Sequence, residues 1–438
     1  MISSKASKKV KKERKKFIIA MIIFAMMFFV RDIFNVNIPQ FIFLLVACFY
    51  YIIFDLDECI AFTATLAVWG SGLQANYAIL FGIFAILLRK YKKIVFSYEF
   101  ILLIFILVWE ALHIFYQPFS VAEYARHMVN YVMIWIVLFD RNTKFDYMLV
   151  IKSFLFVAAF LLLDIMAQTL IYYNFSLQNM LDAGVRFGNI GALTGQENAL
   201  SNNQNLIGMF CGVSIGILTM FLFYTKKKEQ IKYIIFIGFF LFFGLLTQSR
   251  AFIMLVLLAY FFAGLYYSIN HGRNVIISST AVILALILVY LLIVLLLPSV
   301  WQSVLNRLLA DDISGGRISI FKYYNNYILD NTNVFFFGLG LQDVLDKVNF
   351  TSVFPINNVP HNGLQEAFLV WGIVGIPIAL LIFMFIAKNA SQDKKIKIIN
   401  YLPLMLYFSY IQVGHFLGVT YILMILITLF SCIRIDKE

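Results

Sequence analysis

The chain has little charge and no run of short alternating strands. Only 13% of its 438 residues are Asp, Glu, Lys or Arg, and the lack of alternating polar and apolar segments excludes a transmembrane β-barrel. The chain instead has 62% hydrophobic residues, a mean hydropathy of +0.87 and long apolar runs between residues 17 and 432. Because backbone amides in lipid must be satisfied within each segment, these runs predict an all-α polytopic integral membrane protein.

Cysteine is scarce as well, and nothing in its placement indicates a cross-link or a metal. The cysteines lie in or beside apolar segments, without metal-ligand spacing or evident pairing. We therefore expect small packing residues. The four are Cys48, Cys59, Cys211 and Cys432. The chain also lacks an internal repeat and a separate soluble domain.

Acidic residues are outnumbered by basic ones. The chain has 34 Lys and Arg against 23 Asp and Glu, which gives a net charge of +11. The most basic stretch is the N-terminal tail, residues 1–16, which lacks the interleaved aromatics of a nucleic-acid-binding surface. Since Lys and Arg are retained in the cytoplasm, we interpret 1–16 as a cytoplasmic tail near anionic headgroups. No small-residue cleavage site follows residues 17–30, so they predict a retained first span.

Further basic clusters separate the apolar runs. Placing every cluster in the cytoplasm gives about 14 crossings with both termini inside, or about 12 if 58–88 is one re-entrant unit. The predicted location is therefore the cytoplasmic membrane, with multiple passes. The spans are 17–36, 39–54, 58–71, 73–88, 98–116, 123–139, 147–173, 204–224, 231–248, 251–269, 275–297, 363–388, 398–413 and 417–433.

This topology divides the chain into transmembrane helices with short loops over 17–297, a large extracytoplasmic loop over 298–363 and C-terminal transmembrane helices over 364–433. The loop is too long for a simple connector. Its parts 300–310 and 317–329 have helical spacing with an apolar face, which predicts short helices on the membrane surface. Four aromatic residues are expected to act mainly as interfacial anchors. They are Trp301, Tyr323, Tyr324 and Trp371.

Several arginines fall on the outer side, against the positive-inside rule. They are Arg186, Arg250, Arg307 and Arg317. Arg250 lies between two apolar runs in "LLTQSRAFIML", where a cation is costly unless it snorkels, pairs with a carboxylate or binds a ligand. Arg317 follows Gly315 and Gly316 and opens a helical pattern. A guanidinium after a flexible turn, at a helix N-terminus, suits bidentate recognition of phosphate.

His361 opens the stretch "PHNGLQEAFLVWGIVGIP", at the outer mouth of span 363–388. One interpretation is a capped helix N-terminus, in which Asn362 or His361 caps the first turn and Glu366 interacts favourably with the positive end of the helix dipole. The other is that His361 faces a cavity as a base or hydrogen-bonding group. The remaining histidines lack an equivalent cluster: His113, His127, His271 and His415.

Five blocks, in this order, resemble the O-antigen polymerase and ligase superfamily, which includes the Wzy-type polysaccharide polymerases. They are "GALTGQENALSNNQNLIGMF" (191–210), "TQSRAFIMLVLL" (247–258), "SGGRISIF" (314–321), "NVFFFGLGL" (333–341) and "PHNGLQEAFLVWGIVGIP" (360–377). The resemblance covers roughly residues 186–377 and rests on the order and spacing of these blocks.

The resemblance implies a glycosyltransferase with its active site on the outer face of the cytoplasmic membrane. A polymerase of this kind transfers undecaprenyl-diphosphate-linked oligosaccharide repeat units onto one another, as for O-antigen, capsule or exopolysaccharide. Its expected partners are the lipid-linked oligosaccharide, membrane lipid, and flippase and chain-length regulator proteins, but no nucleic acid. Two alternatives stay open: a ligase that passes the glycan to another acceptor, and a lipid-linked oligosaccharide flippase or transporter.

The resemblance also assigns roles to residues. Arg250 and Arg317 are expected to bind the diphosphate, and His361 to accept the proton of the acceptor hydroxyl or to orient that hydroxyl. No cofactor and no metal site are predicted, because the outer segments carry no clustered Asp or Glu signature for a divalent ion. The further substrate-binding candidates are Arg186, Asn205, Gly316, Asn362 and Glu366.

Overall fold

The computed structural model describes most of the chain, and all regular structure in the described part is helical, without a strand. The described residues are 2–70, 75–90, 97–115, 119–139, 146–176, 179–180, 186–188, 203–271, 316–346, 360–391 and 397–432, with the single positions 298, 302 and 305. The predicted span 275–297 and most of the predicted helix 300–310 lie outside them, as does Arg307.

Within these residues, six helical segments are long and apolar enough to cross a membrane. They are α5 with η1 (Tyr98–Ala111 and Leu112–Phe115), α7 (Tyr147–Tyr172), α10 (Gln204–Leu222), α11 (Lys227–Leu246), α12 (Arg250–His271) and the broken pair α19 and α20 (Gly363–Trp371 and Gly375–Ser391). Four shorter apolar segments are α2 (Gln40–Ile53), α4 (Ala75–Lys90), η3 with α21 (Ile398–Tyr401 and Leu402–Ile411) and α22 (Val419–Cys432). The protein is therefore an all-α membrane protein, whereas the number of crossings and their direction stay predictions.

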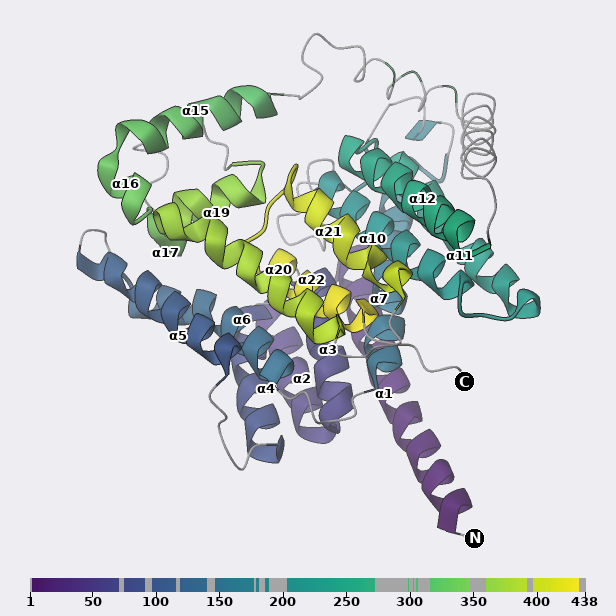
Figure 1. Cartoon of the computed structure of the whole chain (residues 1–438). Coiled ribbons are helices and arrows are strands. Elements are labelled where there is room, and N and C mark those ends of the chain that lie inside the picture. The colour runs from purple at the N-terminus through teal and green to yellow at the C-terminus, as the bar shows by residue number, and fades with distance from the viewer. Residues whose placement is uncertain are drawn as a thin grey trace.

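The other helices complete the bundle and one end of it. They are α1 (Ile2–Ile33), α3 (Leu56–Trp69), α6 (Val121–Phe139), α15 (Arg317–Asp330), α16 (Thr332–Phe336) and α17 (Gly340–Asp346). Residues 2–16 of the basic tail form the first half of α1. α15 covers the predicted helix 317–329. Figure 1 shows α15 at the end of the molecule opposite to the N-terminus.

α1 and α7 lie side by side and run in the same direction. Arg14 forms an ion pair with Asp146, at the start of α7. Eighteen residues further along each helix, Asp32 lies against the buried Asp164. The equal spacing on the two helices requires parallel packing. The predicted topology gives the same orientation to these two spans.

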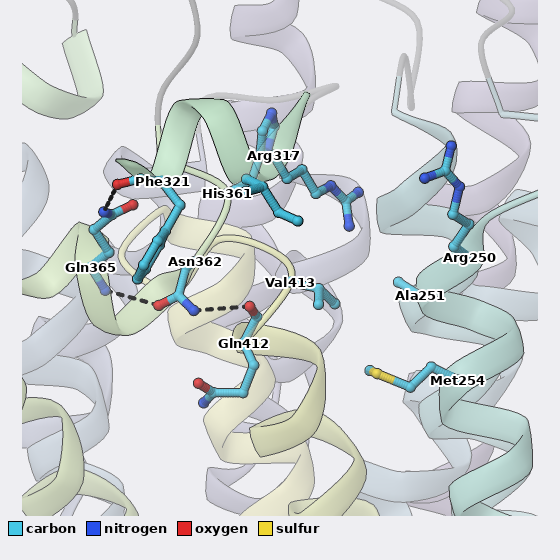
Figure 2. Close-up of a pocket in the computed structure, with 11 residues that line it drawn as sticks. Arg250, Ala251, Met254, Arg317, Phe321, His361, Asn362, Gln365, Gln412 and Val413 are labelled. Atoms are coloured by element: carbon cyan, nitrogen blue, oxygen red, sulfur yellow. Dashed lines mark hydrogen bonds between the residues drawn. The ribbon is translucent and has the colours of Figure 1, made fainter. Parts of the chain in front are cut away.

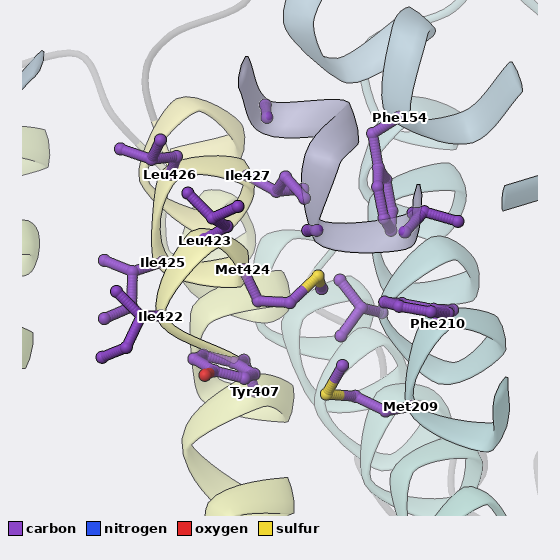
Figure 3. Close-up of a cluster of buried hydrophobic side chains, with 14 of the residues drawn as sticks. Phe154, Met209, Phe210, Tyr407, Ile422, Leu423, Met424, Ile425, Leu426 and Ile427 are labelled. Carbon is purple, nitrogen blue, oxygen red and sulfur yellow. The ribbon is translucent and has the colours of Figure 1, made fainter. Parts of the chain in front are cut away.

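The core of the bundle is apolar and joins its two halves. Figure 3 shows Phe154 of α7 and Phe210 of α10 beside Tyr407 of α21 and Met424 of α22. All four are almost fully buried. Phe154 and Phe210 meet edge to face, with ring centroids 6.3 Å apart. This packing joins α10 and α21 to α7 and α22.

The glycine-rich blocks of the loop and of α19 are in direct backbone contact. The Leu339 amide donates to the Leu369 carbonyl at 2.8 Å. A Cβ on Gly338 would lie 2.2 Å from the Val370 carbonyl oxygen, and one on Gly372 would lie 2.4 Å from that of Phe336. Only glycine permits so close an approach of two backbones. The turn after α16 therefore seats on the end of α19, where Gly372 separates α19 from α20.

A buried carboxylate locks this arrangement to the N-terminal half. Glu110 of α5 accepts hydrogen bonds from the Leu341 amide at 2.8 Å and from the Trp371 indole at 2.9 Å. Trp371 and Tyr324 are fully buried. The prediction that these two side chains are interfacial anchors is therefore wrong, because each packs inside the protein. Trp301 lies outside the described residues.

Candidate functional site

The three predicted catalytic residues surround one pocket of about 420 Å³. Arg250 comes from the start of α12, Arg317 from the start of α15, and His361 precedes α19. Figure 2 shows the Arg317 guanidinium directed across the pocket towards α12. The volume lies in the range of small-molecule sites. The described residues that line it are Arg250, Ala251, Met254, Arg317, Ile318, Phe321, His361, Asn362, Gln365, Gln412 and Val413.

Arg317 is positioned by the glycine before it. Gly316 has a left-handed φ of +84° at the N-cap of α15, and nothing lies within 4 Å of a Cβ placed there. Its glycine identity therefore serves the backbone conformation and not the space around it. Burial lowers the pKa of the half-buried Arg317, Tyr410 opposes that shift and Arg250 adds to it. The guanidinium stays charged because its ordinary pKa is so high.

Arg250 begins α12 directly after a tight hairpin. The Thr247 hydroxyl donates to the Gly244 carbonyl at 2.6 Å and accepts the Ser249 amide at 3.1 Å. In the part of the chain that the structure describes, neither Arg250 nor Arg317 forms an ion pair with a carboxylate. Two cations thus face one pocket, and none of the described residues that line it is acidic. Such an arrangement favours binding of an anion.

His361 has a second histidine beside it. The ring of His415, in the connection between α21 and α22, lies 5.1 Å from that of His361, centroid to centroid. Burial and the charge of Arg317 both lower the pKa of His361. A histidine whose protonated form is disfavoured is neutral near pH 7 and can accept a proton.

The interpretation that no other histidine has a comparable cluster is therefore wrong for His415. A local signal was present in the sequence, because His415 falls in the short turn between spans 398–413 and 417–433, on the same predicted side as His361. What the sequence did not show is that this turn lies against the start of α19.

Glu366 does not line the pocket, but it supports the residues that do. Its carboxylate is 1% exposed and accepts the backbone amides of Phe416 at 2.7 Å and Leu417 at 3.4 Å. Its other oxygen lies 3.9 Å from Nδ1 of His415. Glu366 thus fixes the connection that carries His415, and the expected interaction with the helix dipole is accompanied by these specific contacts.

Amide side chains form the wall below His361. Asn362 caps α19 by accepting the Leu364 and Gln365 amides at 3.0 and 2.9 Å, and it donates to the Gln412 carbonyl at 2.9 Å. Asn362, and not His361, is therefore the cap, which leaves the imidazole for another role. The side-chain amide of Gln365 donates to the Phe321 carbonyl at 2.7 Å, so it joins α19 to α15 (Figure 2).

Arg186 and Asn205 lie beside the pocket and not in its lining. The Arg186 guanidinium donates to the Thr247 carbonyl at 3.4 Å, and Asn205, in the first turn of α10, accepts the Ser249 hydroxyl at 3.1 Å. Both contact the hairpin that presents Arg250. Of the eight predicted residues, the structure places four around the pocket and four behind it. The first group is Arg250, Arg317, His361 and Asn362. The second is Arg186, Asn205, Gly316 and Glu366.

Among the described residues, no group of three or more His, Cys, Asp or Glu side chains could hold a metal ion. The arrangement can bind an anion and, through a neutral imidazole, accept a proton. No known protein family, curated protein or solved structure matches the chain.

Proposed function

We propose that this protein is a polysaccharide polymerase, a glycosyltransferase that joins undecaprenyl-diphosphate-linked repeat units. The observation that carries the proposal is that Arg250, Arg317 and His361 line one pocket, where no carboxylate is found among the lining residues that the structure describes. A diphosphate needs compact positive charge, and an attacking hydroxyl needs a neutral base. The resemblance of five sequence blocks supports the same reaction, since four of these blocks contribute side chains or backbone to the pocket and its immediate supports.

In the proposed reaction, the diphosphate of the donor lies between the two guanidiniums. A hydroxyl of the acceptor sugar attacks the anomeric carbon, a new carbon–oxygen bond forms, and the bond from that carbon to the phosphate oxygen breaks. His361 takes the hydroxyl proton, and the polyprenyl diphosphate leaves with the bonding electrons. Arg250 and Arg317 stabilise the charge that grows on the leaving phosphate, which contributes about 10²–10³-fold for a well-placed donor.

The rest of the lining suits the other parts of this substrate. Ala251, Met254 and Val413 form an apolar wall between α12 and α21, where a prenyl chain would lie. Asn362 and Gln365 line the opposite wall, where the sugar would lie, and their hydrogen bonds to Gln412 and Phe321 hold that wall in place. His415 and Glu366 would hold the His361 imidazole from behind.

A transport function has one observation in its favour. Asp164 is fully buried in the middle of α7 beside Asp32, and Arg31 donates to Asp32 at 2.6 Å. Ionisable residues within a membrane bundle are frequent in ion and substrate pathways. Translocation without bond formation would distinguish this second candidate from the first.

The deciding experiment uses purified protein and a synthetic undecaprenyl-diphosphate-linked repeat unit. A polymerase yields a ladder of products and free undecaprenyl diphosphate, a ligase yields one transfer only when a different acceptor is added, and a flippase moves the substrate across proteoliposomes without new glycosidic bonds. If folded protein forms no new glycosidic bond, either with the repeat unit alone or with a different acceptor added, the proposed reaction is refuted.

A further inference from the structure

A second pocket lies between α1 and α7 and shares no residue with the first. Its volume is about 400 Å³. It lies where Arg14 pairs with Asp146, at the basic end of α1. Its lining is Arg14, Phe17, Ile18, Met21, Asp146, Met148, Leu149, Lys152, Ser153 and Phe156.

The polar end of this pocket holds two cations, Arg14 and Lys152, and one acid, Asp146, and the carboxylate of Asp57 lies close to the Arg14–Asp146 pair. Asp146 accepts Arg14 and also the Leu149 amide at 3.1 Å, because it caps α7. Lys152 is exposed, and no ion pair with a carboxylate is found for it in the described part. Lys15 and Lys16, the exposed residues that follow Arg14 in α1, add two further positive charges at this end. The region therefore attracts an anion.

The apolar end of the pocket opens onto exposed hydrocarbon. Phe17 and Met21 are each 2% exposed and form its floor, whereas Ile18 is 53% and Phe156 41% exposed. The exposed side of α1 next to Ile18 continues as an apolar stripe away from the cations: Ile19, Ile22, Ile23 and Met26. In a membrane protein, such side chains face acyl chains. A ligand that uses both ends of the pocket thus has an anionic head and an apolar tail.

We propose that this pocket binds an anionic phospholipid, with its phosphate at Lys152 and Arg14 and its acyl chains along the α1 stripe. Each Lys or Arg near an anionic lipid surface contributes about 1 kcal/mol, which equals about a fivefold change in affinity. A zwitterionic lipid would not gain from these cations, and free phosphate would not gain from the stripe. The proposal is independent of the transferase reaction.

Native mass spectrometry of the full-length protein, taken from nanodiscs that contain equal phosphatidylglycerol and phosphatidylcholine, tests this site. The wild type is expected to retain phosphatidylglycerol preferentially. Lys152→Gln is expected to reduce that preference about fivefold. The control, Lys232→Gln, removes an exposed cation from α11 and should leave the preference unchanged.

Lys152→Gln is the decisive variant. Arg14→Gln would also remove the ion-pair partner of Asp146 and could disturb the packing of α1 on α7. Equal retention of both lipids by the wild type would overturn the proposal. So would an unchanged preference in Lys152→Gln, or displacement of the lipid by millimolar inorganic phosphate, which would indicate a simple anion site. Glycosyl transfer by detergent-purified protein does not enter this readout, so the two proposals fail separately.

Discussion

The rings of His361 and His415 lie 5.1 Å apart, centroid to centroid, although 54 residues separate them in the chain. Their neighbour Glu366 connects the two segments, since it belongs to α19 and holds the amide of Phe416. The pair therefore belongs to one unit formed by the start of α19 and the turn after α21. Such a unit positions an imidazole more rigidly than a loop histidine alone.

We expect the two histidines to contribute unequally. His361→Ala should lower the rate of transfer about 10²–10⁴-fold, the range for loss of a general base. His415→Ala should have a smaller effect, about tenfold, because His361 remains but is less well oriented. The measurement is ladder formation by purified variants at matched protein concentration. If His415→Ala is as inactive as His361→Ala, the base role belongs to the two histidines together. Full activity of His361→Ala would refute the assignment of His361 as a catalytic residue.

We expect the transfer reaction to require the positive charge of both pocket arginines, Arg250 and Arg317. Arg250→Ala and Arg317→Ala should each reduce the rate about 10²–10³-fold, and Lys should restore only part of it because an ammonium lacks the bidentate fork. Lys322→Ala is the matched control: it removes an exposed cation from α15, the helix that begins with Arg317, and should leave the rate unchanged. Equal losses in the control would indicate damage to α15 and not to the pocket.

The titration of His361 should respond to Arg317. Burial and this guanidinium lower the pKa of His361, so the imidazole should stay neutral to a pH below the ordinary value of about 6.5, and transfer should persist there and fall only at lower pH. Removing a nearby positive charge favours the imidazolium, so Arg317→Gln should raise the pKa of His361. NMR of labelled histidine, with the His361 signal assigned by its loss in His361→Asn, measures the pKa of His361 in the wild type and in Arg317→Gln. A His361 midpoint at or above the ordinary value would contradict this expectation, as would an equal rise in Lys322→Gln.

Local pattern was enough for much of the site. The positive-inside rule selected four arginines, Arg250 and Arg317 among them, because a cation on the outer side of a membrane protein needs a reason. The order Gly-Gly-Arg predicted a turn into a helix, and Gly316 has the left-handed φ of that turn. Apolar runs likewise predicted the helices, because the membrane imposes a length and a composition on each.

Contacts between distant segments were not predictable in this way. Nothing near Glu110 in the sequence indicates that it binds Leu341 and Trp371, more than 200 residues away. Trp371 was expected at the interface because of its residue type, but a buried carboxylate offers its indole a partner inside the protein. His415 was missed for the same reason, since its neighbour His361 is brought to it by tertiary packing.

The Glu110 contacts should be important for stability. Glu110→Ala leaves two buried donors, the Leu341 amide and the Trp371 indole, without their acceptor, at a cost of about 1–3 kcal/mol each. Glu110→Gln keeps one acceptor oxygen, so its stability should lie between those of the wild type and Glu110→Ala. Thermal unfolding in detergent, followed by intrinsic tryptophan fluorescence, measures the difference. Glu229→Ala, on an exposed face of α11, should unfold like the wild type, and an unfolding temperature for Glu110→Ala equal to that of this control would refute the proposed lock.

The turn after α16 should tolerate no side chain at Gly338. This glycine has a φ of +84°, and a Cβ would lie 2.2 Å from the Val370 carbonyl oxygen and 2.6 Å from the Trp371 amide nitrogen. Gly338→Ala therefore adds a backbone clash to about 1–2 kcal/mol of left-handed strain, and it should push the turn off α19. Because Asn362 and His361 lie directly before α19, both the unfolding temperature and the transfer rate should fall. Gly238→Ala, in α11 with nothing within 4 Å of the new Cβ, should preserve both and gain about 0.4–1 kcal/mol as a helical substitution. If the two alanine variants behave alike, the turn does not seat on α19 as described.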